Sequence, residues 1–579
     1  MLRLSELKLP LDHSEADLIR AICKRLTITP EQLKGHQLVK RSVDARKRPA
    51  ISLVYSLDLE LDLPAKAEAQ LLARFRGDPH LKATPDTHYR LVTQVPEEAR
   101  SPTQLPRPVV IGAGPCGYFA ALLLAQMGFN PLLLERGKAI KERTADTFGF
   151  WKGLRPLNPE SNAQFGEGGA GTFSDGKLYS QVSEAKSLVR KVLEELVAAG
   201  ANPEILTLHR PHIGTFKLAT VVRGLRQQIE KLGGEVRFES RVELLERCPI
   251  NQSVQAVVLA SGERIAARQV VLAVGHSARD SFAMLQRIGV AMEPKPFAVG
   301  LRIEHPQALI DRARFGAAAG HPRLGAAEYK LVHHCTGEAA RNRSVYSFCM
   351  CPGGLVVGAT SELGRVVTNG MSQHSRNERN ANSALVVTVT VADVLSYGQG
   401  ANDALAGVAF QRHWEGQAFA AGGGSYRAPA QRVGDFLARQ SSSDGQSSSV
   451  GQANSPAHGP THHPKRAEAV VPSYQPGIQL GSLDGCLPEF ALEAIREALP
   501  SFTKQIPGYA MDEALLTGVE TRTSSPMRIP RDGKTLECLN TPGLYPAGEG
   551  AGYAGGILSA AIDGIKVAEQ VALARQELA

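Results

Sequence analysis

The stretch Pro108-Val-Val-Ile-Gly-Ala-Gly-Pro-Cys-Gly117 decides the fold. An apolar strand comes directly before a G-x-G-x-x-G turn, and a helix-forming segment follows it. In such a turn Gly112 allows the sharp bend and Gly114 lets the backbone approach a pyrophosphate. Gly117 lets the helix pack closely on the sheet. The stretch therefore predicts a dinucleotide-binding turn of an α/β domain.

The segments downstream of this turn agree with that prediction. After the expected helix, Tyr118–Met127, a second apolar strand spans Pro131–Leu134 and is followed by Glu135. Glu135 lies 21 residues after Gly114, which is the usual spacing for a carboxylate that bonds ribose hydroxyls. The N-terminus of the helix would face the diphosphate. We expect a Rossmann-like βαβ unit whose cofactor-binding residues include Gly112, Gly114, Pro115, Gly117, Glu135 and Arg136.

Composition and charge narrow the class of protein. The 579 residues are 43% hydrophobic and 21% charged, which is typical of a globular protein of several domains. The eight cysteines are too sparse for a disulfide scaffold and favour a reducing, cytoplasmic location. The uncharged run 109–134 is long enough to span a membrane, but its glycines and Pro131 favour the βαβ unit instead. We expect no membrane segment.

Two later segments favour FAD over NAD. Gln269–Ser277 is an apolar strand ending in Ala273-Val-Gly275, and it resembles the A-x-G motif that closes FAD domains. Gly543–Gly556 resembles the C-terminal flavoprotein motif in which an acid, here Glu549, meets the ribityl chain. The helix expected from Ile557 to Ala574 would point its N-terminus at the flavin and stabilise the anionic reduced ring. This part of the sequence adds to the predicted cofactor site Gly275, Gly548, Glu549, Gly555, Gly556 and Ile557.

A glycine-dense segment, Gln164–Lys177, has five glycines in 14 residues. Such a segment suits a loop that wraps the flavin, and the alternative is a glycine-rich surface loop. It contributes Gln164, Gly166, Gly168 and Gly169 to the predicted cofactor site. Its polar residues near the expected chemistry are Glu167, Ser174, Asp175 and Lys177.

The pattern along the chain indicates three units. Residues 1–100 are expected to form a small α+β domain, with strands at Leu2–Leu9 and Ile51–Leu63 and a capped helix from Ser14 to Leu26. Residues 101–285 and 512–579 are expected to form a discontinuous FAD-binding domain. Residues 286–511 are expected to form an inserted, β-rich substrate or cap domain. Within it, 439–466 is rich in Ser, Gly, Gln, Pro and His and is expected to be a disordered insertion.

These motifs together resemble a known family, the widespread and mostly uncharacterised FAD-dependent dehydrogenases of bacteria and plastids. The resemblance covers nearly the whole chain. Besides the motifs above it rests on four segments, which are Ser42-Val-Asp-Ala-Arg-Lys47, Arg210-Pro-His-Ile-Gly214, Lys295-Pro-Phe-Ala-Val-Gly-Leu-Arg302 and Phe348-Cys-Met-Cys-Pro-Gly-Gly354. It implies a flavoprotein core of the glutathione-reductase type with two dinucleotide-binding domains, and Glu as the usual acid at position 549. It implies no substrate.

The catalytic candidates are Lys295, Arg302, Cys349 and Cys351. The two cysteines could form a redox pair beside the flavin or could simply alternate along a strand. Other polar residues that could bind substrate or transfer protons are His212, Lys217, His374 and Arg376. No second complete G-x-G-x-x-G is present, so NAD(P)H would dock transiently, or another donor, such as a redox protein partner, would reduce the flavin.

The function predicted from these observations is FAD-dependent oxidoreductase, with hydride transfer through flavin N5 to or from an unknown small molecule. A FAD monooxygenase is an alternative. A second alternative is a flavoprotein that uses the basic run Lys40–Arg48 to bind RNA or a protein. No metal site is expected, because His458, His462 and His463 lack accompanying carboxylates or cysteines.

Overall fold

The computed structural model describes the chain except for residues 47–49, 96–105, 180–186, 401, 444–469 and 579. Residues 102–108 are proline-rich, a pattern that predicts a linker, and they fall largely outside the described residues, as does most of the insertion expected at 439–466. Residues 439–443 are described, and Ser442 among them is buried and donates a hydrogen bond to Asp435. The start predicted for the disordered insertion is therefore wrong for these five residues.

A five-stranded parallel sheet forms around the glycine turn. Its strand order is β23-β11-β5-β6-β7. Apolar side chains point to both faces because helices cover one side and a small antiparallel sheet covers the other. The parallel strands are β5 (Val109–Ile111), β6 (Leu132–Leu134), β7 (Glu235–Arg237), β11 (Val270–Leu272) and β23 (Leu544–Pro546).

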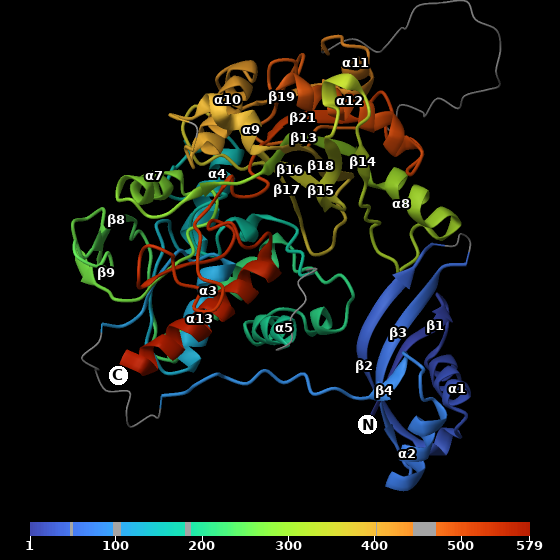
Figure 1. Cartoon of the computed structure of the whole chain (residues 1–579). Coiled ribbons are helices and arrows are strands. Elements are labelled where there is room, and N and C mark those ends of the chain that lie inside the picture. The colour runs from blue at the N-terminus through green and yellow to red at the C-terminus, as the bar shows by residue number, and fades with distance from the viewer. Residues whose placement is uncertain (47–49, 96–105, 180–186, 401, 444–469, 579) are drawn as a thin grey trace, which may run out of the picture.

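Helices α3 (Pro115–Gln126) and α13 (Ile557–Leu578) lie side by side on one face of this sheet, although they are distant in sequence (Figure 1). Gly564 of α13 allows this approach, because a Cβ there would lie 2.1 Å from the Cys116 carbonyl oxygen. Further helices on this unit are α4 (Ile140–Trp151), α5 (Leu188–Ala198) and α6 (Thr215–Lys231).

The opposite face is covered by a three-stranded antiparallel sheet and helix α7 (Arg279–Arg287). The sheet contains β8 (Val242–Arg247), β9 (Val254–Leu259) and β10 (Arg264–Ala266). The sequence pattern predicts one strand over 236–246, but β7 and β8 are separate. The backbone turns at Glu239 (φ 53°), which carries the chain from one sheet to the other.

A seven-stranded sheet forms the second large unit, in the order β14-β15-β18-β13-β21-β19-β20 (Figure 1). Its strands are β13 (Phe297–Pro306), β14 (Val332–His334), β15 (Ser344–Cys351), β18 (Asn380–Val389), β19 (Ala428–Arg432), β20 (Ile478–Leu480) and β21 (Leu515–Glu520). Strand β21 falls within 512–579, which the sequence assigns to the FAD-binding domain. It pairs with β13 and β19 instead, so this boundary differs from the expected one.

Helices and two short strand pairs complete this unit. The hairpin of β16 (Gly354–Gly358) and β17 (Thr368–Ser372) contacts α4, where the Trp151 indole donates a 2.7 Å hydrogen bond to the Gly358 carbonyl. The remaining pair is β12 (Glu293–Pro294) with β22 (Met527–Arg528). The helices are α8 (Gln307–Phe315), α9 (Val391–Val394), α10 (Ala406–Ala421), α11 (Val433–Leu437) and α12 (Glu489–Thr503).

The N-terminal unit has the antiparallel order β2-β3-β1-β4 and lies at the side of the molecule (Figure 1). Its elements are β1 (Leu2–Pro10), α1 (Glu15–Leu26), β2 (Leu33–Asp44), β3 (Ser52–Leu61), α2 (Ala65–Arg74) and β4 (Leu81–Ala83). The capping box predicted at Ser14 is present, with Asp17 as its partner. The edge strand β2 is extended by backbone hydrogen bonds between Arg41 and residues 207 and 209.

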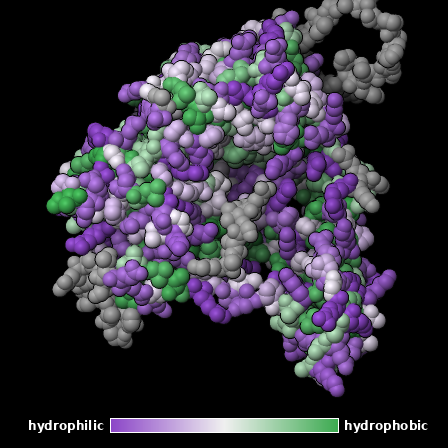
Figure 2. Space-filling model, viewed as in Figure 1, coloured by the Kyte–Doolittle hydropathy of each residue, from purple (hydrophilic) through white to green (hydrophobic). Residues whose placement is uncertain are grey.

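Within the described ranges, no helix combines the length and apolar character that crossing a membrane demands. Hydrophobic residues on the face drawn in Figure 2 are scattered among hydrophilic ones, as on most globular proteins.

Candidate functional site

One deep cavity connects the two large units. It holds about 1570 Å³ when the space open to solvent at its entrance is included, and it extends from the end of β5 to the wall formed by β15, β17 and β21. Eleven of the predicted cofactor-binding residues line it, which are Gly112, Gly114, Pro115, Glu135, Arg136, Gln164, Gly169, Gly275, Glu549, Gly556 and Ile557. Five others do not line it, which are Gly117, Gly166, Gly168, Gly548 and Gly555.

The glycines of the G-x-G-x-x-G turn have different roles. A Cβ on Gly112 would lie 2.4 Å from the Ala273 carbonyl oxygen, and one on Gly117 would lie 1.8 Å from the Gly112 carbonyl oxygen. Both residues are thus required by packing within the protein. Gly114 has a negative φ, and the nearest atom to its Cβ position, on Gly169, is 3.9 Å away. Gly114 therefore leaves space in the cavity itself.

Two further glycines leave the same kind of space. Gly275 (φ 73°) and Gly556 (φ 95°) line the cavity, and neither Cβ position has an atom within 4 Å. A positive φ favours glycine at both positions. Together with Gly114 they make a wall of exposed backbone along which a phosphate-bearing ligand could pass closely.

Glu135 is buried and holds the glycine loops together. One carboxylate oxygen accepts a 2.8 Å hydrogen bond from the Ala113 amide. The other accepts 2.9 Å hydrogen bonds from the amides of Gly137 and Gly166. A carboxylate offers about four acceptor positions, so one remains for the ribose hydroxyl that the spacing predicts. The structural role of Glu135 was not expected from the sequence.

Arg136 lies at the mouth of the same end of the cavity. Its guanidinium forms ion pairs with Glu160 and Asp280, both at 2.8 Å, and lies 4.2 Å from the centre of the Phe165 ring. The positive charge of Arg136 is thus already balanced by carboxylates of the protein, without a ligand phosphate.

The loop 164–177 passes between α3 and the seven-stranded unit, with a short 3-10 turn at Ala170–Phe173. Gln164 accepts a 3.0 Å hydrogen bond from the Ser277 hydroxyl, which ties the loop to the opposite wall. Gly166 and Gly168 leave room for buried neighbours, since Cβ atoms there would meet Arg143 at 2.4 Å and Thr172 at 2.1 Å. These two glycines thus let the loop pack closely against buried residues on its side away from the cavity.

Glu549 lies where β23 leads toward α13. Burial raises the pKa of this carboxyl to about 7, while the Gly556 amide and Lys295 act in the opposite direction. Lys295 itself does not line the cavity, and burial lowers the pKa of its ammonium group. The Gly548 amide instead donates a 2.7 Å hydrogen bond to the Asp563 carboxylate on α13. Gly555 does not line the cavity, and a Cβ there would have no atom within 4 Å.

Arg302 lies behind the inner wall and does not line the cavity. It is fully buried in β13 and donates hydrogen bonds to the Cys349 carbonyl at 3.0 Å and to the Asn369 side chain at 3.2 Å. The sequence groups Arg302 with residues that contact substrate. The structure makes it a positioning residue, because its side chain is occupied in holding β15 and β17.

The two cysteines line the inner end of the cavity as free thiols. Cys349 has φ 43° and interrupts the pairing of β15 with β18, so it opens onto the cavity while Cys351 stays buried. The Cys351 thiol lies 3.3 Å from the Cys349 carbonyl. Desolvation within the cavity raises the pKa of Cys349 to about 12 and also raises that of Cys351, so both remain protonated near neutral pH.

The loop also places Ser174, Asp175 and Lys177 on the lining, as expected, whereas Glu167 is buried under it. The Lys177 ammonium pairs with Asp175 at 2.9 Å and donates to the Met350 carbonyl. Asp175 also pairs with Arg376, and these cations hold the pKa of Asp175 well below its usual range despite burial.

Four other polar candidates lie off the cavity. His212 contacts the carbonyl of His374, and the two rings stack with centres 5.3 Å apart. Lys217 is exposed, and Arg376 pairs with Asp175 and Glu328. None of these four side chains lines the cavity.

Several lining residues were missed from the sequence. Glu520 ends β21 and Arg522 follows it by two residues, while Asn369 lies on β17. Arg522 is held by the buried carboxylate of Glu415 at 3.0 Å, and Glu415 also pairs with Arg279 at 2.7 Å. No sequence spacing links these residues, because the contacts join segments more than 100 residues apart.

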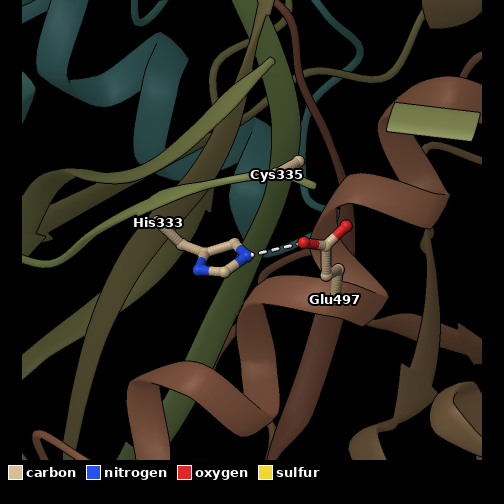
Figure 3. A group of neighbouring side chains, drawn as sticks. All are labelled: His333, Cys335 and Glu497. Atoms are coloured by element: carbon tan, nitrogen blue, oxygen red, sulfur yellow. Dashed lines mark hydrogen bonds and ion pairs between the residues drawn. The ribbon is translucent and has the colours of Figure 1, made fainter. Parts of the chain in front are cut away.

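His333, Cys335 and Glu497 gather outside the cavity, where β14 meets α12, and their donor atoms all lie within 4.8 Å of one another (Figure 3). His333 is hydrogen-bonded to Glu497 at 3.0 Å, and the same carboxylate accepts from the amides of Thr336 and Gly337 at 2.8 and 3.1 Å. Glu497 thus caps the turn after β14, and these hydrogen bonds lower the pKa of its carboxyl to about 2.

Comparisons with known proteins bear on this cavity. A family model described as FAD-dependent protein, C-terminal domain-like, matches residues 296–523, and a domain of unknown function (DUF8436) matches residues 1–60. An uncharacterised protein of Clostridium beijerinckii is 44% identical over 572 residues, which cover 98% of each chain. This chain belongs to the same family as that Clostridium beijerinckii protein, and its residues 296–523 match the FAD-dependent domain. FAD is therefore its cofactor, and the exposed backbone at Gly114, Gly275 and Gly556 provides the narrow path that a dinucleotide requires.

Solved structures also match parts of this FAD-dependent protein. CtdE in complex with FAD is 12% identical and covers 82% of this chain and 89% of its own, with a TM-score of 0.29. The tetrameric form of 2-methyl-3-hydroxypyridine-5-carboxylic acid oxygenase is 14% identical and covers 51% and 62%, with a TM-score of 0.24. A GidA-related protein from Thermus thermophilus is 17% identical and covers 33% and 72%, with a TM-score of 0.19. The match thus spans less than two thirds of the oxygenase chain.

Proposed function

We propose that this FAD-dependent protein is an oxidoreductase in which a hydride passes between flavin N5 and a small organic substrate. One observation carries the proposal. A single cavity joins the glycine turn after β5, the start of α13 and a polar inner wall that contains Cys349, Asn369 and Glu520. The cavity thus has room for a reactant beyond the backbone path that a dinucleotide would occupy.

The residues that would hold FAD follow from the lining. Gly112–Cys116 and the N-terminus of α3 would face the diphosphate, because helix N-termini attract anions. Glu135 would accept a ribose hydroxyl, and Glu549 with Gly556 would lie along the ribityl chain. When bound, FAD supplies hydride acceptance and donation at N5.

The protein itself would stabilise charge on the cofactor, hold a proton beside it and fix the walls of the cavity. The 22-residue helix α13 directs its positive end toward the cavity and would stabilise negative charge there. Glu549 changes protonation near neutral pH and could hold a proton beside the cofactor. The buried ion pairs of Lys177 and Arg522 fix the walls without adding unpaired charge.

The parallel sheet with α3 and α13 is proposed to be the FAD-binding unit of the glutathione-reductase type, and the seven-stranded unit is proposed to cover the substrate. NAD(P)H is proposed to dock transiently and to reduce the flavin. In the basic run at Lys40–Arg48, Arg46 pairs with Asp44 at 2.7 Å, and Lys47 and Arg48 lie outside the described residues, so RNA or protein binding by this run is kept as an alternative proposal.

An anaerobic titration tests the function. Purified protein is expected to retain FAD and to lose its flavin absorbance on addition of NADPH or NADH, and air should restore the absorbance. If neither nucleotide acts, photochemical reduction should still bleach the flavin reversibly, which would indicate a different donor. Protein that cannot be reconstituted with FAD, or whose flavin remains oxidised under photoreduction, would overturn the proposal.

A further inference from the structure

A buried carboxyl with an unused oxygen faces the inner end of the cavity. Glu520 is the last residue of β21, is 3% exposed and lines the cavity. Its Oε2 has no hydrogen-bond partner among the described residues. Oε2 is itself closed to the cavity and faces Arg302, so a ligand would meet the other oxygen, Oε1, to which no described residue donates a hydrogen bond.

Arg302 compensates the charge of Glu520 without occupying this oxygen. The Arg302 Nε lies 3.6 Å from Oε2, which is too long for a hydrogen bond, and it too lacks a partner within the described structure. The other nitrogens of Arg302 donate to β15 and β17. The guanidinium is thus fixed against Oε2, and Oε1 of Glu520 is the acceptor left for a ligand in the cavity.

The groups around Glu520 favour proton exchange by this residue. Burial raises its pKa, and Arg302 on β13 and Thr368 on β17 act in the opposite direction. From β15, Cys349 and Cys351 face the same end, and their raised pKa values keep them neutral. Glu520 is therefore the carboxyl on this wall that can hold a proton more tightly than a free carboxyl does.

The charges of the cavity also limit the substrate. Of the described cationic side chains that line it, Lys177 pairs with Asp175, Arg522 with Glu415, Arg136 with Glu160 and Asp280, and Arg241 lies within 4.0 Å of Glu160, Glu243 and Asp280. A carboxylate or phosphate substrate would find no unpaired cation there. A neutral group that donates a hydrogen bond would find Glu520.

We propose that Glu520 is the catalytic acid–base of this enzyme and that the substrate is an alcohol or amine, or the corresponding carbonyl or imine. In the oxidative direction the substrate C–H bond breaks, and its hydrogen leaves with both electrons as hydride to oxidised FAD. The O–H or N–H proton moves to the Glu520 carboxylate, and a C=O or C=N bond forms. The reverse reaction returns both hydrogens. This inference rests on the proposed function.

The test uses FAD-loaded protein under anaerobic conditions. A panel of secondary alcohols and amines is mixed with the wild type, and flavin reduction is followed by absorbance at a series of pH values. At least one compound should reduce the flavin, with a rate that rises as Glu520 loses its proton. Glu520→Gln should slow this reduction by about 100-fold or more and remove that pH dependence. Glu520→Asp should restore part of the rate.

Controls separate catalysis from structure. Glu497→Gln makes the same carboxyl-to-amide change in the turn cap outside the cavity, and it should leave rate and pH profile unchanged. FAD content and photoreduction should match in all variants. As a readout besides activity, the melting temperature of Glu520→Gln relative to the wild type should rise with pH, since the raised pKa of Glu520 makes its ionised form costly in the fold.

The outcomes distinguish this inference from the proposed function. A wild type that binds and photoreduces FAD, yet is reduced by no alcohol or amine, overturns the substrate class while the oxidoreductase proposal stands. A Glu520→Gln variant with unchanged rate and pH profile overturns the role of Glu520. Failure to bind FAD overturns the proposed function itself.

Discussion

At the scale of single residues, the site depends on a few buried ionisable groups whose surroundings set their charge. Glu549, Glu520 and Glu415 are all carboxyls deep in the protein, yet they differ. Burial raises the pKa of Glu549 and Glu520, whereas Arg279 and Arg522 overcome burial at Glu415 and lower its pKa. Glu549 can therefore exchange a proton near neutral pH, Glu520 holds its proton more tightly than a free carboxyl does, and Glu415 is a fixed charge.

The raised pKa of Glu549 predicts a pH-dependent stability. Its folded pKa of about 7 exceeds the ordinary value of 4.5, so the folded state binds the proton more tightly than the unfolded state does. The stability from this proton is complete below the unfolded pKa and is lost as pH rises through about 7. In FAD-free protein, Glu549→Gln should therefore gain stability relative to the wild type by up to about 3 kcal/mol from pH 5 to pH 9. Urea unfolding measures this, and a pH-independent difference would contradict it.

The Glu415 ion pairs predict a large loss of stability. Glu415→Gln leaves Arg279 and Arg522 buried with only the partly exposed Glu362 as counter-charge. The free energy of unfolding should fall by about 3–5 kcal/mol, and FAD should bind more weakly because Arg522 lines the cavity. Glu362→Gln is the matched control and should cost much less. Equal losses in the two variants would show that Glu415 has no special role.

At the scale of elements, the glycine turn could be predicted from sequence because each of its requirements is local. The apolar strand, the turn and the helix over 109–126 occur as expected. Strand β2 was missed, because no residue of Leu33–Asp44 is buried and its residues show no two-residue alternation. Helix α4 and the split of β7 from β8 were also missed, since tertiary contacts set them. The packing role of Glu135 depends on Gly166, 31 residues away, which spacing alone does not reveal.

The turn geometry predicts which glycine serves the cofactor. Gly114→Ala should fold normally, since its Cβ would have no protein atom closer than 3.9 Å, but the methyl group would fill the cavity beside the diphosphate. Its dissociation constant for FAD should rise by about 10-fold or more, because a crowded backbone approach weakens each hydrogen bond there. Fluorescence titration with FAD measures this. Gly555→Ala, next to the cavity but off its lining, is the control and should bind FAD normally.

At the scale of the whole molecule, the chain consists of two large sheets with the cavity between them and a smaller N-terminal unit at the side. The discontinuous arrangement was predictable in outline, because the motifs occur in order along the chain. The inner wall was not, because Glu520, Cys349 and Asn369 come from three strands of two sheets. Their meeting depends on long-range strand order, which the sequence does not encode in any local pattern.

Contacts between units predict a measurable coupling of the N-terminal unit to the rest. Arg323 donates hydrogen bonds to the carbonyls of Leu11 and His13 at 2.7 and 3.0 Å. Arg323→Ala should leave these partly buried carbonyls without this donor and cost about 1–3 kcal/mol of local stability. Hydrogen exchange of the amides in β1 and α1 should then speed up, while those in α3 stay protected. Unchanged exchange in β1 would mean that this contact does not hold the unit.

The most direct test of the account is a crystal structure of the protein with FAD bound. The account predicts the diphosphate at Gly112–Cys116 beneath the N-terminus of α3, and the flavin ring within contact of the wall formed by Cys349, Asn369 and Glu520. A ring that lies outside the cavity, or that is separated from this wall by protein, would contradict it.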